Sequence, residues 1–153
     1  MLKYFRRRRA QLRQLSVRQK TFLVASAAHL TMVALALRAL GVARVRGALL
    51  RSTPATLKRV DVRLAQELGT LVNIAARRLP LASSCLVRSL SLEWALRRRG
   101  IACRLRIGSR IEAGTFHAHA WVECDGIPVN DRDDIASRFG VFEGPAWSGS
   151  PGT

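Results

Sequence analysis

The sequence is poor in cysteine, with only three in 153 residues. Three thiols cannot all pair, which excludes a small secreted domain built on a disulfide framework. The chain also lacks an uncharged apolar run of the ~20 residues that a membrane span requires, and it lacks internal repeats and low-complexity tracts. Hydrophobic residues make up 48% and charged residues 24% of the chain. This composition excludes a disordered protein and fits one compact domain.

Acidic residues are absent from residues 1–60, which carry 14 Lys and Arg, whereas residues 111–153 carry seven acids and two basic residues. The formal net charge is +16, and 23 of the 26 basic residues are arginine. A positive surface attracts anionic lipid, nucleic acid or an acidic protein partner, but it also serves solubility alone. Because RNA-binding aromatic motifs and zinc-finger spacing are missing, no nucleic-acid partner is expected.

Composition divides the chain into three parts. Residues 1–52 are expected to form a basic and apolar helical module, residues 53–142 the core, and residues 143–153 a flexible tail rich in Gly, Pro and Ser. The charge of the first part makes it a candidate docking surface for a partner protein, a peptide or a membrane.

Within the first module, a basic arm containing Arg6–Arg9 precedes a strongly apolar helix over residues 21–40, and a basic amphipathic segment follows over residues 42–51. The apolar helix is interpreted first as a buried core helix. The alternatives are a helix in a membrane interface, with peripheral membrane contact through residues 1–51, and a signal or spanning segment. The lone His29 in this helix is expected to be packed rather than to bind a ligand.

Two further helices are expected in the core. Apolar residues at helical spacing predict one helix over residues 55–78, with Ser52 or Thr53 as its cap and Pro54 in its first turn. A second helix is predicted over residues 85–99, with a serine cap before it and a left-handed glycine after it.

Beyond residue 100 the apolar period changes to strict alternation. Strands are predicted over residues 101–107, 116–124 and 127–131, the last two joined by a hairpin turn at an Asp-Gly pair. A short helix is expected to start at Asp133 or Asp134. Helices followed by an antiparallel sheet indicate the α+β class.

A nucleophile is indicated at Cys85, the first residue of a predicted helix. Free N–H groups and the helix dipole stabilise a thiolate there, lowering the thiol pKa from its usual ~8.5, and the Cys85 N–H can hold the oxyanion of a tetrahedral intermediate. His119 follows 34 residues later on a strand, and Asp131 another 12 residues later on the next strand. This order matches the nucleophile, general base and orienting acid of a thiol hydrolase.

The hairpin register decides whether His119 can face Asp131. A two-residue loop at Asp125 and Gly126 places His119 opposite Arg132 and turns Asp131 to the other face of the sheet, whereas a three-residue loop with a bulge places His119 opposite Asp131. The apolar pattern favours the first register and the chemistry favours the second. We predict the bulged register or an equivalent local kink.

Other side chains compete for these roles. His117 shares a strand face with His119 and is an alternative base, and the two could bind zinc together with Cys85. No second Cys/His pair stands at finger spacing, so no metal or cofactor is expected. The carboxylates that compete with Asp131 are Asp125, Asp133 and Asp134. The two thiols expected to be structural are Cys103 and Cys124.

The segments RRLPLASSCLVRSLSLEWALRRRGIACRLRIGSR and FHAHAWVECDGIPVND resemble the core of the B2 proteins of lasso peptide biosynthesis. These are small members of the transglutaminase-like, papain-related cysteine protease superfamily. The resemblance covers residues 60–132 and implies the papain/transglutaminase-like fold, with the cysteine helix packed on a small antiparallel sheet. Cys85, His119 and Asp131 fall where the family places nucleophile, base and orienter, and Trp121 matches a position that packs under the site.

The same resemblance implies a cytoplasmic leader peptidase. Such a peptidase cuts a ribosomally made precursor peptide between leader and core, and an ATP-dependent macrolactam cyclase then acts on the freed core. A chain of the split form depends on a separate leader-recognition protein of the B1 type, and we expect this partner here. The alternatives are an acyltransferase with the same Cys-His-Asp triad and a non-catalytic basic adaptor at a membrane or partner surface.

Overall fold

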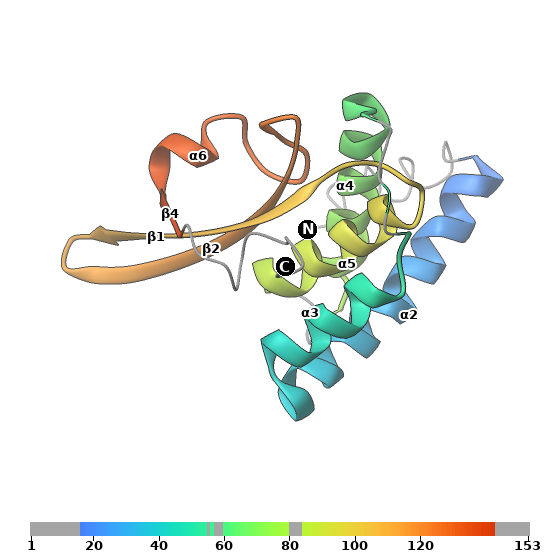
Figure 1. The fold of residues 1–153 in the computed structure, drawn as a ribbon, viewed down its shortest axis with the longest axis horizontal. Helices are drawn as coiled ribbons and strands as arrows, with labels where there is room; N and C mark the ends of the chain where they lie inside the picture. The colour runs from blue at the N-terminus through green and yellow to red at the C-terminus, as the bar shows by residue number, and fades with distance from the viewer. Residues whose placement is uncertain (1–15, 55, 57–59, 80–83, 143–153) are drawn as a thin grey trace, which may run out of the picture.

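The structure, a computed structural model, describes residues 16–54, 56, 60–79 and 84–142. The expected features at Arg6–Arg9 and in the tail 143–153 lie outside these residues. Among these residues, the chain order is four helices, three strands, a short helix and a last short strand, with a helical layer beside a long hairpin that projects away from it (Figure 1). The elements are α2 (Val17–Leu40), α3 (Val42–Arg51), α4 (Val62–Ala76), α5 (Cys85–Arg97), β1 (Arg104–Glu112), β2 (Thr115–Cys124), β3 (Ile127–Pro128), α6 (Ile135–Arg138) and β4 (Gly140–Val141).

Helix α2 begins at a reciprocal cap, in which the Ser16 hydroxyl accepts from the Gln19 N–H and the Gln19 side chain accepts from the Ser16 N–H. It ends at Gly41, whose φ of 77° suits only a residue without Cβ. One face of α2 is buried against α4 and α5 through Leu30 and Val33. Its length and apolar composition over Gln19–Leu40 would also allow it to cross a membrane, a property that core helices share.

The expected helix over residues 55–78 is shorter than the pattern suggested. It starts at Val62, where the Asp61 carboxylate accepts from the Leu64 N–H. The Ser52 and Thr53 hydroxyls instead donate to the last carbonyls of α3, at 2.7 Å each. Ser52 therefore ends the preceding helix and does not begin the next.

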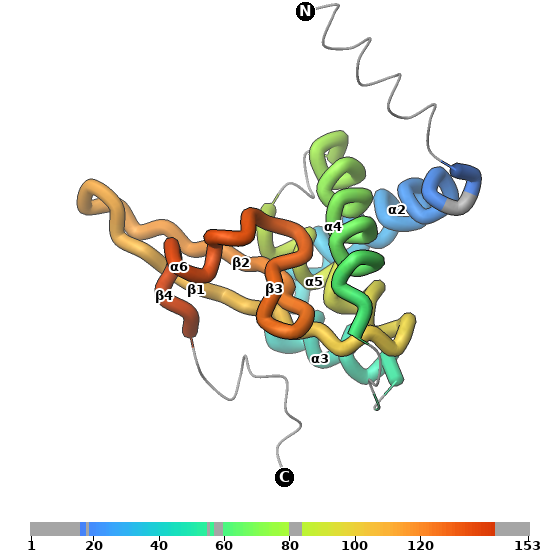
Figure 2. The backbone as a smooth tube through the Cα atoms, turned by 90° about the horizontal axis from the view of Figure 1, so that it is seen from above, coloured from blue at the N-terminus to red at the C-terminus, as the bar shows by residue number. Residues whose placement is uncertain are grey.

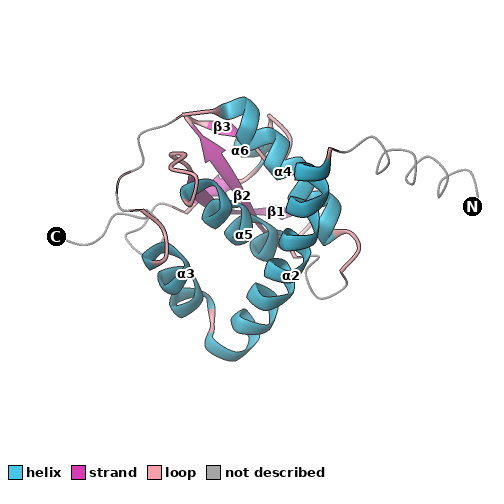
Figure 3. Cartoon of the chain, turned by 90° about the vertical axis from the view of Figure 1, so that its right-hand side faces the viewer, coloured by secondary structure: helices cyan, strands magenta, loops and turns pink. Residues whose placement is uncertain are grey.

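Helix α5 occupies the centre of the molecule and contacts α2, α3, α4, β1 and β2 (Figure 3). Ser84 caps it as expected, and Gly100 follows it with a φ of 73°. Glu93 on this helix is buried and pairs with Arg46 of α3 at 3.3 Å while accepting from the Leu105 N–H of β1. One buried carboxylate thus joins three elements.

The sheet is antiparallel with the order β3-β2-β1-β4. Two strand predictions were wrong in extent. The first strand was predicted over residues 101–107 but runs from Arg104 to Glu112, and its centre pairs with both β2 and the unforeseen strand β4. Glycine at position 108 lets these neighbours approach: a Cβ there would lie only 2.9 Å from the Gly140 carbonyl oxygen and from the Phe139 side chain, too close for either.

The predicted bulge between β2 and β3 was wrong. Asp125 and Gly126 both have positive φ, 52° and 75°, so they form a two-residue turn that pairs Cys124 with Ile127. The third strand stops at Pro128 instead of residue 131, and the chain bends away from the sheet before Asp131. The alternative prediction of a local kink therefore describes this segment correctly. Figure 2 shows this loop running beside α4 before it turns toward α6.

Candidate active site

Cys85 is the first residue of α5 and is partly buried. The Ser84 hydroxyl accepts from the Val87 N–H at 3.2 Å, which fixes the start of the helix. The N–H groups of the first helical residues have no acceptor within the helix and point beyond its start. Cys85 thus lies at the positive end of the helix dipole, where a thiolate or an oxyanion is stabilised.

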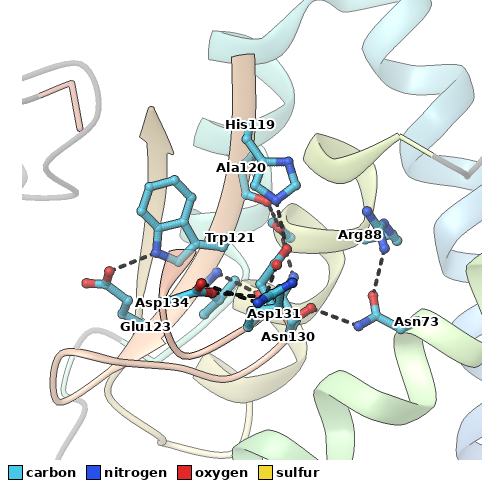
Figure 4. Close-up of polar contacts among 12 residues, drawn as sticks. Asn73, Arg88, His119, Ala120, Trp121, Glu123, Asn130, Asp131 and Asp134 are labelled. Carbon is cyan, nitrogen blue, oxygen red and sulfur yellow. Dashed lines mark hydrogen bonds and ion pairs between the residues drawn. The ribbon is translucent and has the colours of Figure 1, made fainter. Parts of the chain in front are cut away.

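His119 lies between Cys85 and Asp131. Its Nε2 is 2.7 Å from the Asp131 Oδ2 (Figure 4), and the Cys85 thiol interacts with the same ring. Since Nε2 is engaged by the carboxylate, Nδ1 is the nitrogen left for the sulfur. The fold therefore brings together the three side chains that the sequence singled out, from α5, from β2 and from the loop after β3.

These contacts shift the three pKa values in a consistent sense. The hydrogen bonds with Asp131 and Cys85 raise the pKa of His119 to about 9. The hydrogen bond with His119, followed by one from the Ala120 backbone and the charges of His119 and Arg88, lowers the pKa of the Cys85 thiol despite its burial. Burial opposes ionisation of Asp131, but hydrogen bonds from His119 and the Arg132 N–H hold its pKa below the usual value. The shifts at Cys85 and His119 both favour the charged forms, a thiolate and an imidazolium.

Asp131 is held through the residue before it. Asn130 is buried, its Oδ1 accepts from the Val122 N–H at 2.8 Å, and its carbonyl accepts from Asn73 of α4 at 2.8 Å (Figure 4). The loop can lie this close to α4 because Gly69 has no side chain: a Cβ there would overlap the Val129 carbonyl oxygen. The kink at the end of β3 is thus fixed by side-chain hydrogen bonds and a glycine contact.

The departure of β3 also leaves the edge of β2 open beside the site. The Ala120 carbonyl accepts from the buried Ser89 hydroxyl at 2.9 Å, and Ser89 in turn accepts from the Asn130 side chain at 3.0 Å. The Ala120 N–H faces the Cys85 sulfur. Backbone groups that would otherwise pair with a strand are satisfied by α5, which fixes the helix against His119.

Aromatic rings cover the other side of His119. Phe139 stacks on the imidazole with ring centroids 5.3 Å apart, and the fully buried Trp121 lies beside it at 6.3 Å. The Trp121 indole donates to Glu123 at 2.8 Å, so its polar edge is satisfied. These rings restrict the rotation of the imidazole and exclude water from one of its faces.

The competing candidates lie elsewhere. His117 is exposed on the hairpin, where it pairs with Arg110. Of the competing carboxylates, Asp125 lies in the hairpin turn, and Asp134 is paired with Arg132 at 3.0 Å. Within the described part of the chain, no three His, Cys, Asp or Glu side chains form a group suited to a metal ion. The remaining thiols, Cys103 and Cys124, are buried, and the Cys103 thiol donates to the Glu93 carbonyl at 3.7 Å.

Sequence reasoning missed the residues that support the site. Ser89 and Arg88 follow Cys85 by one helical turn, and this spacing alone could have placed them on the cysteine face of α5. Asn130, directly before Asp131, carried a weaker signal. Phe139 carried none, because it reaches the site through β4, which the sequence did not predict.

The fold and the site define a small α+β protein with a cysteine at a helix start, next to a histidine from a sheet and an aspartate from the loop that follows its last hairpin strand. The chain belongs to the transglutaminase-like superfamily, whose family model matches residues 27–143. Members of this superfamily usually have a catalytic cysteine and act as cysteine proteases or acyltransferases. No curated protein and no solved structure matches the chain.

Proposed function

We propose that the protein is a cysteine peptidase that removes the leader from a ribosomally synthesised lasso precursor peptide. The observation that carries this proposal is the Nε2–Oδ2 distance of 2.7 Å between His119 and Asp131, with Cys85 hydrogen-bonded to the same imidazole at the start of α5. The superfamily match supports a thiol acyl-transfer reaction, and the resemblance of residues 60–132 to B2 proteins supports the substrate.

In the proposed reaction, the Cys85 thiolate attacks the carbonyl carbon of the last leader residue. The carbonyl oxygen becomes an oxyanion, which the N–H groups at the start of α5 stabilise. The intermediate collapses as the C–N bond breaks, and the His119 imidazolium gives its proton to the leaving amine of the core peptide. His119 then accepts a proton from water, which attacks the thioester and releases the leader. Asp131 holds the imidazole in place through both acylation and deacylation.

Transfer of the acyl group to an amine uses the same residues and is the alternative outcome. The two reactions differ only in what attacks the thioester. Mass spectrometry of the leader product made with an added primary amine separates them: a free carboxyl group indicates hydrolysis, and an amide of the added amine indicates transfer.

The partners follow from the proposed reaction. A separate B1-type leader-recognition protein would deliver the precursor, and the ATP-dependent macrolactam cyclase would take the core. Exposed apolar residues along α2, opposite its buried face, support a peripheral membrane contact of a cytoplasmic enzyme, with basic residues of the first module near lipid phosphates. These residues are Val17, Val24, Met32 and Leu35.

The test is incubation of the full chain with a candidate precursor and its recognition protein, read by mass spectrometry. The wild type should release leader and core, and Cys85→Ala should release neither. Cys103→Ala is the matched control, because this thiol is buried away from the site, and it should keep the activity. Leader release by Cys85→Ala would refute the assignment. Salt-sensitive lipid binding without thiol reactivity at Cys85 would favour the non-catalytic adaptor instead.

A further inference from the structure

A polar cleft of about 470 Å³ lies directly beside the site, between α4 and the loop that carries Asp131. Its walls include Thr70 and Asn73 of α4, Arg88 of α5, and Asp131 itself. Arg88 stands three residues after Cys85, so the two side chains share a face of α5. Arg88 and Asp131 therefore connect the cleft to the side chains of the site.

Three guanidinium groups line this cleft, from three separate segments. They belong to Arg77 at the end of α4, Arg88 on α5 and Arg132 after Asp131. The single acid in the lining, Asp131, is committed to His119. Arg132 pairs with Asp134, but both side chains are largely exposed, and such a pair is readily exchanged. The cleft thus has a surplus of positive charge that favours an anionic group.

Arg88 adds a more specific requirement. One of its terminal nitrogens donates to the Asn73 Oδ1 at 3.1 Å (Figure 4), whereas its Nε is buried without a hydrogen-bond partner among the described residues. A buried donor without an acceptor is unfavourable, and an acceptor that reaches it removes that penalty. Carboxylates suit guanidinium donors because two oxygens can accept from neighbouring N–H groups.

We infer that this cleft, defined by Arg77, Arg88 and Arg132, is a subsite for an acidic side chain of the peptide substrate, close to the bond that is cut. The inference rests on the proposed peptidase function and adds a substrate class to it. An Asp or Glu side chain entering the cleft would meet the guanidinium groups of Arg77, Arg88 and Arg132. The contact would hold the peptide next to Cys85 without taking part in the chemistry.

The test uses acetylated and amidated peptides that carry a single Glu, Gln or Lys at each position in turn, with the full chain and its recognition protein. Blocked ends ensure that only a side chain supplies the carboxylate. At one position the wild type should cleave the Glu peptide about 10-fold faster than the Gln peptide at low substrate, which corresponds to about 1.4 kcal/mol. The difference should lie in KM. Cleavage without any preference for Glu would overturn the subsite and leave the peptidase function standing.

Charge reversal gives the sharper readout. Arg77→Glu should abolish the preference for Glu and favour Lys at that position. Arg78→Glu is the matched control, since Arg78 is the next residue, is exposed and does not line the cleft. An equal loss of preference in both variants would overturn the subsite in favour of general surface charge. A wild-type chain that cleaves none of the peptides would overturn the proposed function, and the subsite with it.

Discussion

Gly69→Ala should lower the activity although Gly69 does not belong to the site, because this glycine of α4 packs against the loop that carries Asp131. An added Cβ would overlap the Val129 carbonyl oxygen and stand 2.9 Å from its carbonyl carbon and 3.2 Å from the Asn130 Cα. Carbon atoms in contact are ordinarily ~3.5–4.0 Å apart, so the loop has to retreat from α4 by about 1 Å. These contacts are with backbone atoms, which cannot swing aside as a side-chain end does.

The retreat would move Asp131 with its loop. The hydrogen bond from His119 is 2.7 Å long, and a shift of this size would carry it beyond hydrogen-bonding distance. Misplacement of a reacting group by about 1 Å can cost 10²-fold in rate, so we expect a loss of kcat/KM of about that size. The pKa of His119 should fall from about 9 toward its usual value, because its largest cause is the bond with Asp131.

The assay is leader cleavage, together with the pH dependence of Cys85 alkylation and the thermal midpoint. Gly47→Ala is the matched control: it is also a helical glycine, and its added Cβ would meet only the flexible end of Arg51 at 3.3 Å. Both substitutions gain about 1 kcal/mol of helix propensity. The control should therefore be fully active. A Gly69→Ala protein with normal kcat/KM and unchanged Cys85 ionisation would refute the argument that this glycine positions Asp131.

Three further outcomes are expected. Activity should rise as Cys85 ionises, below the usual thiol pKa, and should fall as pH rises through about 9, where His119 loses its proton. The stability that the raised pKa of His119 contributes is fully present below pH 6.5 and is lost as pH rises through about 9. Asp131→Asn should move the loss of activity at high pH to a lower pH. Ser89→Ala should lower the free energy of unfolding by about 1–3 kcal/mol in urea titrations, because it leaves the Ala120 carbonyl and the Asn130 amide unpaired, and an unchanged midpoint would contradict this. The double variant Val24→Asp and Leu35→Asp should no longer co-sediment with anionic vesicles but should keep its cleavage activity. Equal co-sedimentation of the variant and the wild type would exclude α2 as the membrane contact.

The sequence was sufficient to predict the cysteine helix and its place before an antiparallel sheet. Helical spacing and the serine before Cys85 are local signals, and the α5 start at this residue follows from them. The strand alternation likewise predicted β2 to within one residue of its start. These elements are determined by short-range patterns, which one sequence displays in full.

The remaining features depend on contacts between distant segments. The early end of β3 is caused by Asn130 bonding to β2 and α4 rather than continuing the strand. The strand β4 consists of Gly140–Val141 alone, too short to show alternation. The hydroxyls of Ser52 and Thr53 could equally end one helix or start the next. They end α3, because Asp61 provides the cap at the start of α4. The Ser52 and Thr53 hydroxyls also accept from Trp94 and Arg97 of α5, contacts with a distant segment that the local sequence does not display.

The error in the hairpin register also identifies what the site requires. The chemistry demanded a carboxylate opposite His119, and a bulge is one way to supply it, but the turn at Asp125 and Gly126 keeps the regular register. The carboxylate arrives because the chain leaves the sheet over Gly69. A relative that keeps Cys85, His119 and Asp131 but has a larger residue at the position of Gly69 should therefore lack the His–Asp hydrogen bond, so the three functional side chains alone are an insufficient sign of activity.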